Sequence, residues 1–174
     1  MNMFKSLSIA VIAVLSFGMS QAQATELFDF TFSGPSASGS GTLVANPNGD
    51  GTFTVISGSG TETVLGASDT LTLLSNPNGT SFANSPKGLF YFDDQLLLTT
   101  NPLLDLGGLM FSTSQGAEVN IWATGANAYT YANERVINES TNFTLSDEGV
   151  IPEPASIALL GLGLLAFTAV RRKS

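Results

Sequence analysis

The sequence predicts an all-β domain, an antiparallel sandwich or a flattened barrel, flanked by an apolar segment at each end of the chain. Apolar and polar residues alternate with a period of two through most of residues 25–150, as in strands with one buried face. Gly, Ser, Thr and Asn separate the short alternating runs, and the chain holds 18 glycines. About ten such runs follow one another without a long stretch of helical periodicity, which is typical of a sandwich or a barrel.

Residues 1–24 have the three parts of a secretory signal peptide. Lys5 supplies a positively charged start, residues 7–19 form an apolar run, and Ala22-Gln23-Ala24 has the small-x-small pattern of a cleavage site. We therefore expect an exported protein whose mature chain begins near Thr25.

The first strand is expected within residues 27–34. Its three aromatic side chains, Phe28, Phe30 and Phe32, fall on one face. The side chains between them are mostly polar and fall on the other face. This strand should therefore have one side in the core and one side in water.

A β-hairpin is expected from residues 37–45 and 51–61, joined by the turn sequence NPNGDG. Asn46, Asn48 and Asp50 in this turn resemble the opening of a calcium loop, in which alternate oxygens converge on the ion. Position twelve of such a loop should be a glutamate, and here it is Ser57. A hairpin turn is therefore the preferred interpretation, and a calcium site completed from elsewhere in the fold is the alternative.

The remaining strands are expected at 69–75, 88–92, 95–99, 106–113, 117–125, 128–133 and 142–146. Asp93 and Asp94 follow one of these runs. Adjacent carboxylates at a strand end point to opposite faces, so they do not form a catalytic dyad. We expect a solvated turn here.

The strand at 117–125 carries a candidate glycan-binding surface. One face is apolar, with Val119, Ile121 and Ala123; the other holds Glu118, Asn120, Trp122 and Thr124. Tyr129 and Tyr131 share a face of the next strand and are expected beside Trp122 across a short turn. Aromatic rings flanked by amides and carboxylates suit sugar rings, which have apolar faces and polar edges. The candidate site is therefore Glu118, Asn120, Trp122, Tyr129 and Tyr131, and packing as a second core layer is the alternative.

The composition excludes several classes of function. The chain has no Cys and no His, which excludes a Ser-His-Asp triad, a cysteine nucleophile and a His- or thiolate-ligated metal. Residues 25–150 hold thirteen acidic residues against Lys87 and Arg135, a net charge of −11. This charge repels nucleic acid. We expect no enzyme, no catalytic residues and no cofactor.

The C-terminal segment has the composition of a short membrane helix. Residues 155–170 contain no charged side chain, and as a helix they would span about 24 Å, near the lower limit for a bilayer core of about 30 Å. Pro152 and Pro154 keep the preceding chain extended, because neither can continue a helix. Three basic residues follow this segment and favour the cytoplasmic side: Arg171, Arg172 and Lys173.

The order Pro152-Glu153-Pro154, an apolar run containing LLGLGLLA and a terminal RRKS resembles the PEP-CTERM sorting signal of Gram-negative bacteria. In that family the signal is recognised by an exosortase, a membrane-embedded cysteine protease-like enzyme, in bacteria that secrete exopolysaccharide. The resemblance implies that Pro152, Glu153 and Pro154 are the recognition motif and that the chain is processed near them. It also implies transient anchoring in the inner membrane before delivery to the cell surface or extracellular matrix.

We therefore expect a signal peptide at 1–24, an all-β extracellular domain at 25–150 and a sorting signal at 151–174 that contains a transmembrane helix at 155–170. The expected role is structural or binding, at the cell surface or in the biofilm matrix. The expected partners are an exosortase, the cytoplasmic membrane before processing, and exopolysaccharide. One alternative is a carbohydrate-binding module for exopolysaccharide, and a less favoured one is a hydrolase that uses carboxylates.

Overall fold

The structure is a computed structural model that describes residues 24–134 and 137–150. The expected signal peptide up to residue 23 lies outside these residues. So do the Pro-Glu-Pro motif, the expected helix at 155–170 and the basic residues 171–173. Within the described ranges, no helix has the length and apolarity to cross a membrane.

The described chain is all β, which confirms the predicted fold class. It contains eleven strands, β1 Glu26–Ser33, β2 Ala37–Pro47, β3 Thr52–Val64, β4 Ala67–Leu73, β5 Ala83–Asn84, β6 Tyr91–Phe92, β7 Gln95–Leu97, β8 Leu109–Thr113, β9 Glu118–Gly125, β10 Ala128–Asn133 and β11 Ile137–Val150. The runs expected at 88–92 and 95–99 form only the short strands β6 and β7. The run expected at 142–146 is part of a much longer strand, β11, and β5 was not predicted.

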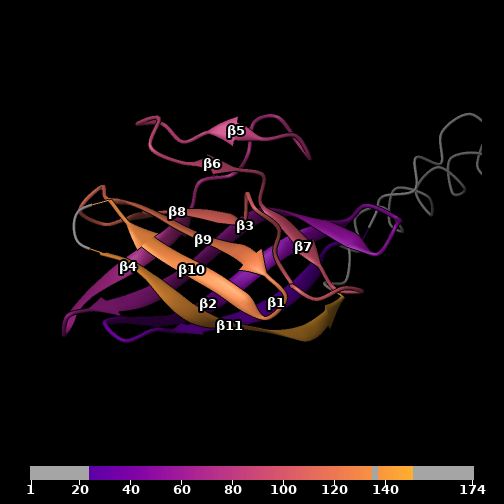
Figure 1. Ribbon diagram of the computed structural model, residues 1–174. Helices are drawn as coiled ribbons and strands as arrows, with labels where there is room; N and C mark the ends of the chain where they lie inside the picture. The colour runs from indigo at the N-terminus through magenta and orange to yellow at the C-terminus, as the bar shows by residue number, and fades with distance from the viewer. Residues whose placement is uncertain (1–23, 135–136, 151–174) are drawn as a thin grey trace, which may run out of the picture.

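Eight of the strands close into an antiparallel barrel (Figure 1). Their order is β2-β1-β11-β10-β9-β8-β4-β3, and β3 pairs back to β2. Closure removes the open sheet edges that a sandwich would keep. Of the two architectures expected, the barrel is the one formed. Strand β7 adds to β3 at Thr52–Thr54, beyond the Ser59–Val64 segment that pairs with β4.

The barrel interior is filled by aromatic and aliphatic side chains from every second position. Phe28, Phe30 and Phe32 are buried while the residues between them are exposed, as predicted. The ring of Phe30 lies 5.5 Å from that of Phe111, and the ring of Phe32 lies 5.1 Å from that of Tyr131, between centroids. These contacts place the main core inside the barrel.

Two glycines in β2 make room for these rings. A Cβ atom on Gly41 would lie 2.8 Å from Cε1 of Phe30, and one on Gly39 would lie 2.6 Å from Cζ of Phe32. Both distances are too short for real carbon atoms. The phenylalanines of β1 therefore require glycine at both positions of β2.

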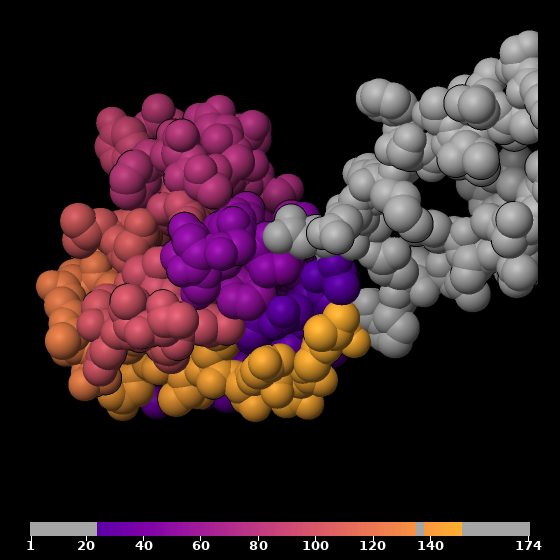
Figure 2. All heavy atoms as spheres, turned by 90° about the vertical axis from the view of Figure 1, so that its right-hand side faces the viewer, coloured from indigo at the N-terminus to yellow at the C-terminus, as the bar shows by residue number. Residues whose placement is uncertain are grey.

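Residues 74–94 leave the barrel and cover part of its outer surface; we call this segment the flap. It contains the two-stranded sheet β5–β6, which stands above β8 in Figure 1 and forms a raised block in Figure 2. Ala83 and Phe92 of the flap pack on Met110, which points out of the barrel because its neighbours Leu109 and Phe111 point in. The protein therefore has a small second core outside the barrel.

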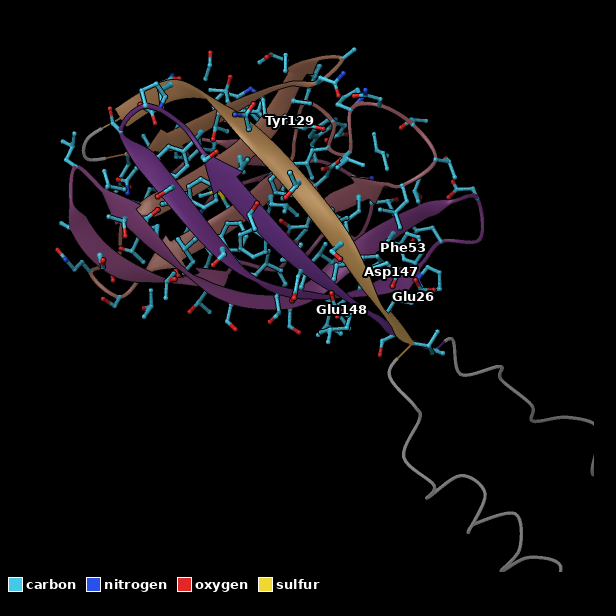
Figure 3. All side chains as sticks on the ribbon, turned by 90° about the horizontal axis from the view of Figure 1, so that it is seen from below. Glu26, Phe53, Tyr129, Asp147 and Glu148 are labelled. Carbon is cyan, nitrogen blue, oxygen red and sulfur yellow. The ribbon has the colours of Figure 1, made fainter. Side chains whose placement is uncertain are left out.

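The two ends of the barrel domain lie together. In the pairing of β1 with β11, Glu26 is opposite Val150. Figure 3 shows Glu26 beside Asp147 and Glu148, where β1 begins and β11 ends. The segments that precede and follow the barrel therefore start from one edge of the domain.

Candidate functional site

Two adjacent carboxylates, Asp93 and Asp94, lie where the flap rejoins the barrel. Their side chains are 2% and 0% exposed, so the expected solvated turn is wrong. The cause is the backbone of Asp94, whose N–H donates to Gly108 O at 3.0 Å and whose carbonyl accepts from Val55 N at 2.8 Å. These bonds hold the end of the flap against β3 and the start of β8.

Asp94 is buried with only part of its hydrogen-bonding capacity used. Its Oδ1 accepts a 3.0 Å hydrogen bond from Met110 N, whereas its Oδ2 has no partner. Burial raises the pKa of Asp94 to about 8, because desolvation disfavours the charged carboxylate. Asp94 also has a φ of +55°, a left-handed conformation that Asp tolerates better than most residues.

Asp93 faces a second acid, Asp105, from the loop that precedes β8. Burial, and then the interaction with Asp105, raise the pKa of Asp93 to about 7. Asp93 Oδ2 accepts a 3.3 Å bond from Gln95 Nε2, but no donor reaches its Oδ1. Asp105 Oδ1 accepts from Gly107 N and Gly108 N at 2.8 and 3.0 Å.

Sequence reasoning missed the pairing of Asp93 with Asp105. The prediction that Asp93 and Asp94 do not form a dyad is consistent with the structure, because the partner of Asp93 is twelve positions further along the chain. The two described surface cavities are lined by other residues.

The residues of the candidate glycan site divide into two groups. Glu118 and Asn120 face outward from β9, as predicted, but the flap covers them. Glu118 accepts hydrogen bonds from Ser85 Oγ at 2.7 Å and Lys87 N at 2.8 Å. Asn120 Nδ2 donates to Tyr91 O at 3.2 Å. The polar groups expected to bind a sugar therefore fix the flap to the barrel.

Tyr129 and Tyr131 do not lie beside Trp122, so this part of the prediction is wrong. Tyr131 is opposite Ile121 in the pairing of β10 with β9, and strand partners share a face. The two tyrosines therefore point into the barrel, where they are 6% and 0% exposed, while Trp122 remains partly exposed on the outside. Tyr129 is labelled near β11 in Figure 3, and its hydroxyl accepts a 2.9 Å bond from Leu103 N.

The segment that resembles a calcium loop forms a hairpin turn, which is the interpretation that the sequence favoured. Asp50 Oδ1 accepts from Thr52 N at 2.9 Å and from Thr52 Oγ1 at 2.6 Å, and these bonds lower the pKa of Asp50. Asn48 Oδ1 accepts from Thr54 Oγ1 at 3.0 Å. Asn46 precedes the turn and is opposite Thr54 in the ladder. In the part of the chain that the structure describes, no group of three or more acidic side chains is placed to hold a metal.

A cavity of about 320 Å³ opens near the β3–β4 turn, and Glu62 lies in its wall. Glu62 is buried and accepts hydrogen bonds from Tyr131 Oη at 2.7 Å and Asn133 Nδ2 at 3.1 Å. Desolvation raises the pKa of Glu62, and the two hydrogen bonds oppose that shift. Both carboxylate oxygens of Glu62 therefore already accept hydrogen bonds from within the barrel.

The exposed apolar side chains are concentrated on the flap and the loop before β8. Phe82 is 53% exposed and Tyr91 is 68% exposed, and both belong to the flap together with the exposed Leu89. Leu106 is exposed on the neighbouring loop, and Phe82 lies against its neighbour Gly107. Aromatic rings exposed in this way favour a contact surface.

The comparisons with known proteins identify the end of the chain. Residues 150–173 match the family model of the PEP-CTERM protein-sorting motif. No curated protein and no solved structure matches the chain. The motif defines an exported protein with a membrane-anchored precursor. More particularly, the chain carries the PEP-CTERM sorting motif at residues 150–173, which supports sorting by an exosortase.

Proposed function

We propose that the mature barrel acts at the cell surface or in the extracellular matrix as a structural or binding component. The observation that carries this proposal is a PEP-CTERM motif placed directly after the last strand of a closed domain. The proposal assigns the barrel no catalytic step. The signal peptide, the transient membrane anchor and the final location at the surface are parts of the same proposal.

The position of the barrel ends supports processing without damage to the fold. Glu26 is opposite Val150 in the β1–β11 ladder, and Pro152 follows two residues later. Cleavage near the Pro-Glu-Pro motif would therefore remove a tail and leave every barrel strand complete. A domain that keeps its closed fold after release is suited to a lasting role outside the cell.

The experiment for this proposal isolates the extracellular matrix of the producing bacterium and identifies the protein by intact-mass spectrometry. We expect a chain that starts near Thr25 and ends near Pro152–Pro154, bound to matrix components in a pull-down. Recovery of the mature chain only as a free species, with no matrix component attached, would contradict the structural or binding role.

Carbohydrate binding is the second candidate, and the exposed rings of Phe82 and Tyr91 favour it. Tyr91 is opposite Asn84 in the β5–β6 ladder, so an exposed ring lies next to an amide. This combination suits a sugar, which offers C–H groups to a ring and hydroxyls to an amide. The candidate glycan surface thus moves from the tyrosines of β10 to the flap.

A binding assay against the native exopolysaccharide tests this second candidate. Phe82→Ala and Tyr91→Ala should each weaken binding about tenfold, as expected for the loss of one stacked ring. Leu65→Ala is the matched control, because Leu65 is equally exposed but lies in the β3–β4 turn. Wild-type protein that binds no glycan, or flap variants that bind like wild type, would exclude carbohydrate recognition by the flap.

A further inference from the structure

The last strand of the barrel continues past the end of one of its neighbours. β11 pairs with β10 only through residues 137–141, and from Asn142 to Val150 it pairs with β1 alone. Within the described residues, these nine positions have no strand on their second side, and we call that side the β11 edge. We propose that the β11 edge pairs antiparallel with the β11 edge of a second copy and joins two barrels into a dimer.

The backbone of the β11 edge is free to pair. The loop between β7 and β8 reaches the neighbouring strand, where Leu103 N donates to Tyr129 Oη, but among the described residues no backbone hydrogen bond joins that loop to residues 142–150. A cavity of about 590 Å³ lies where the edge begins, and Asn142 is part of its lining. Figure 3 shows this part of β11 on the near side of the barrel, with no other ribbon in front of it. A free edge of this length is a template for a further strand.

Only the far part of the β11 edge is protected against pairing. Asp147 and Glu148 are exposed charges, and the pairing with β1 shifts its register beside them, which marks a β-bulge. Charges and bulges of this kind keep edge strands from pairing with other chains. Residues 142–146 are uncharged and pair with β1 in unbroken register. They are therefore the segment that can accept a partner strand.

The sequence of this segment suits a second copy of the same chain. An antiparallel pair of identical strands is related by a two-fold axis. With Thr144 on the axis, Phe143 of each copy would face Leu145 of the other, and Asn142 would face Ser146. A register centred on the acidic end of the strand would instead place like charges opposite each other, which is unfavourable. The uncharged segment therefore favours pairing centred on Thr144.

Pairing would also extend the cover of the core at this edge. Phe143 is 5% exposed inside the barrel, whereas Leu145 packs against the core and stays partly exposed. In the dimer each Leu145 would lie beside a Phe143 on the inner face, and apolar cross-strand pairs of this kind stabilise a sheet. The pairing is a property of the barrel itself, so it does not depend on the sorting motif or on the role of the protein outside the cell.

Analytical ultracentrifugation of the mature protein tests the dimer, over about 10 μM to about 1 mM, the range expected for a small interface. The wild type should dimerise, and more tightly in about 0.5 M than in about 0.05 M NaCl, because salt screens the repulsion between two acidic barrels.

Charge reversal at the axis tests the register. Thr144→Glu and Thr144→Lys should each weaken the dimer about fivefold, because like charges would then face each other across the axis. An equal mixture of the two variants should restore association, which a folding defect in either variant would not allow. Thr31→Glu is the matched control and should dimerise like wild type. Thr31 shares a 2.7 Å hydrogen bond with Thr144 and lies on β1, so β11 separates it from the second copy.

A disulfide tests the same contact independently. The chain has no cysteine, so Thr144→Cys introduces a single thiol. Mild oxidation should link two copies of this variant, because residues that face each other in an antiparallel pair have Cα atoms within disulfide reach. Thr31→Cys should stay largely unlinked. The same comparison on the full chain in detergent keeps the tail common to both variants, so a failure of processing cannot be mistaken for a failure of pairing.

Three results would overturn the dimer. The first is a wild-type protein that stays monomeric at the highest concentration and salt. The second is a mixture of Thr144→Glu and Thr144→Lys that associates no better than either variant alone. The third is equal cross-linking of Thr144→Cys and Thr31→Cys. A monomer whose amides at 142–146 are protected from hydrogen exchange would show that another segment of the same chain covers the β11 edge.

Discussion

Tyr131 donates a 2.7 Å hydrogen bond to Glu62 across the interior of the barrel. The two residues come from β10 and β3, which are four strands apart in either direction around the eight-stranded ring. Asn133 of β10 supplies a second bond to the same carboxylate, at 3.1 Å. The buried carboxylate of Glu62 thus joins opposite walls of the barrel, and its hydrogen bonds depend on the positions of both β3 and β10.

Removing the hydroxyl of Tyr131 should destabilise the barrel. Tyr131→Phe keeps the ring that stacks on Phe32 but leaves Glu62 Oε2 without its donor. A buried acceptor without a partner costs about 1–3 kcal/mol. Urea unfolding should show this loss, while Tyr91→Phe, which changes an exposed ring, should unfold like wild type. Equal stability of Tyr131→Phe and wild type would contradict the role of this bond.

The stability of the protein should fall between pH 5 and pH 8. The pKa of Asp94 is about 8 in the folded chain and near 3.8 in the unfolded chain. The folded state therefore binds more protons than the unfolded state in this window. The stability that protonated Asp94 contributes is lost as the pH rises. The loss is at most about 1.4 kcal/mol per pH unit for one group.

Asp94→Asn should reduce this pH dependence, because an amide oxygen can still accept from Met110 N without carrying a charge. The measurement is the urea midpoint at pH 5 and at pH 8, with Asp29→Asn as the exposed control. A wild-type protein that is as stable at pH 8 as at pH 5 would show that the buried acids do not titrate as described.

A methyl group on Gly41 should destabilise the barrel without changing any charge. Its Cβ would overlap Ser59 O and lie 2.8 Å from the ring of Phe30. Overpacking of this kind costs about 1–3 kcal/mol. Thermal unfolding of Gly41→Ala should show the loss, and Ser40→Ala, at the neighbouring exposed position, should be close to wild type. If Gly41→Ala and Ser40→Ala unfold at the same temperature, the description of close packing between β1 and β2 is wrong.

The alternation of side chains explains which parts of the fold could be predicted. Phe28 and its neighbours were assigned to the correct faces because the two faces of a strand follow from position alone. The same rule separated Ile121 from Trp122. It could not say which of those faces Tyr131 shares, since that depends on the register of β10 against β9.

The burial of Asp93 was missed for a related reason. A carboxylate next to a turn is usually solvated, and local sequence contains no sign that the flap folds back over β8. The contacts that bury it come from Gly107 and Asp105, which are distant in the chain. The sorting motif was recognised fully because its three parts follow one another in the sequence.

Replacing Pro152, Glu153 and Pro154 with alanine tests most directly the claim that this barrel is delivered outside the cell by its PEP-CTERM motif. The measurement is the amount and intact mass of the protein in the membrane and extracellular fractions. The wild-type protein should appear outside the cell as a shortened chain, and the variant should stay in the membrane at full length after signal-peptide removal. A variant that reaches the extracellular fraction at the wild-type mass and amount would contradict the account.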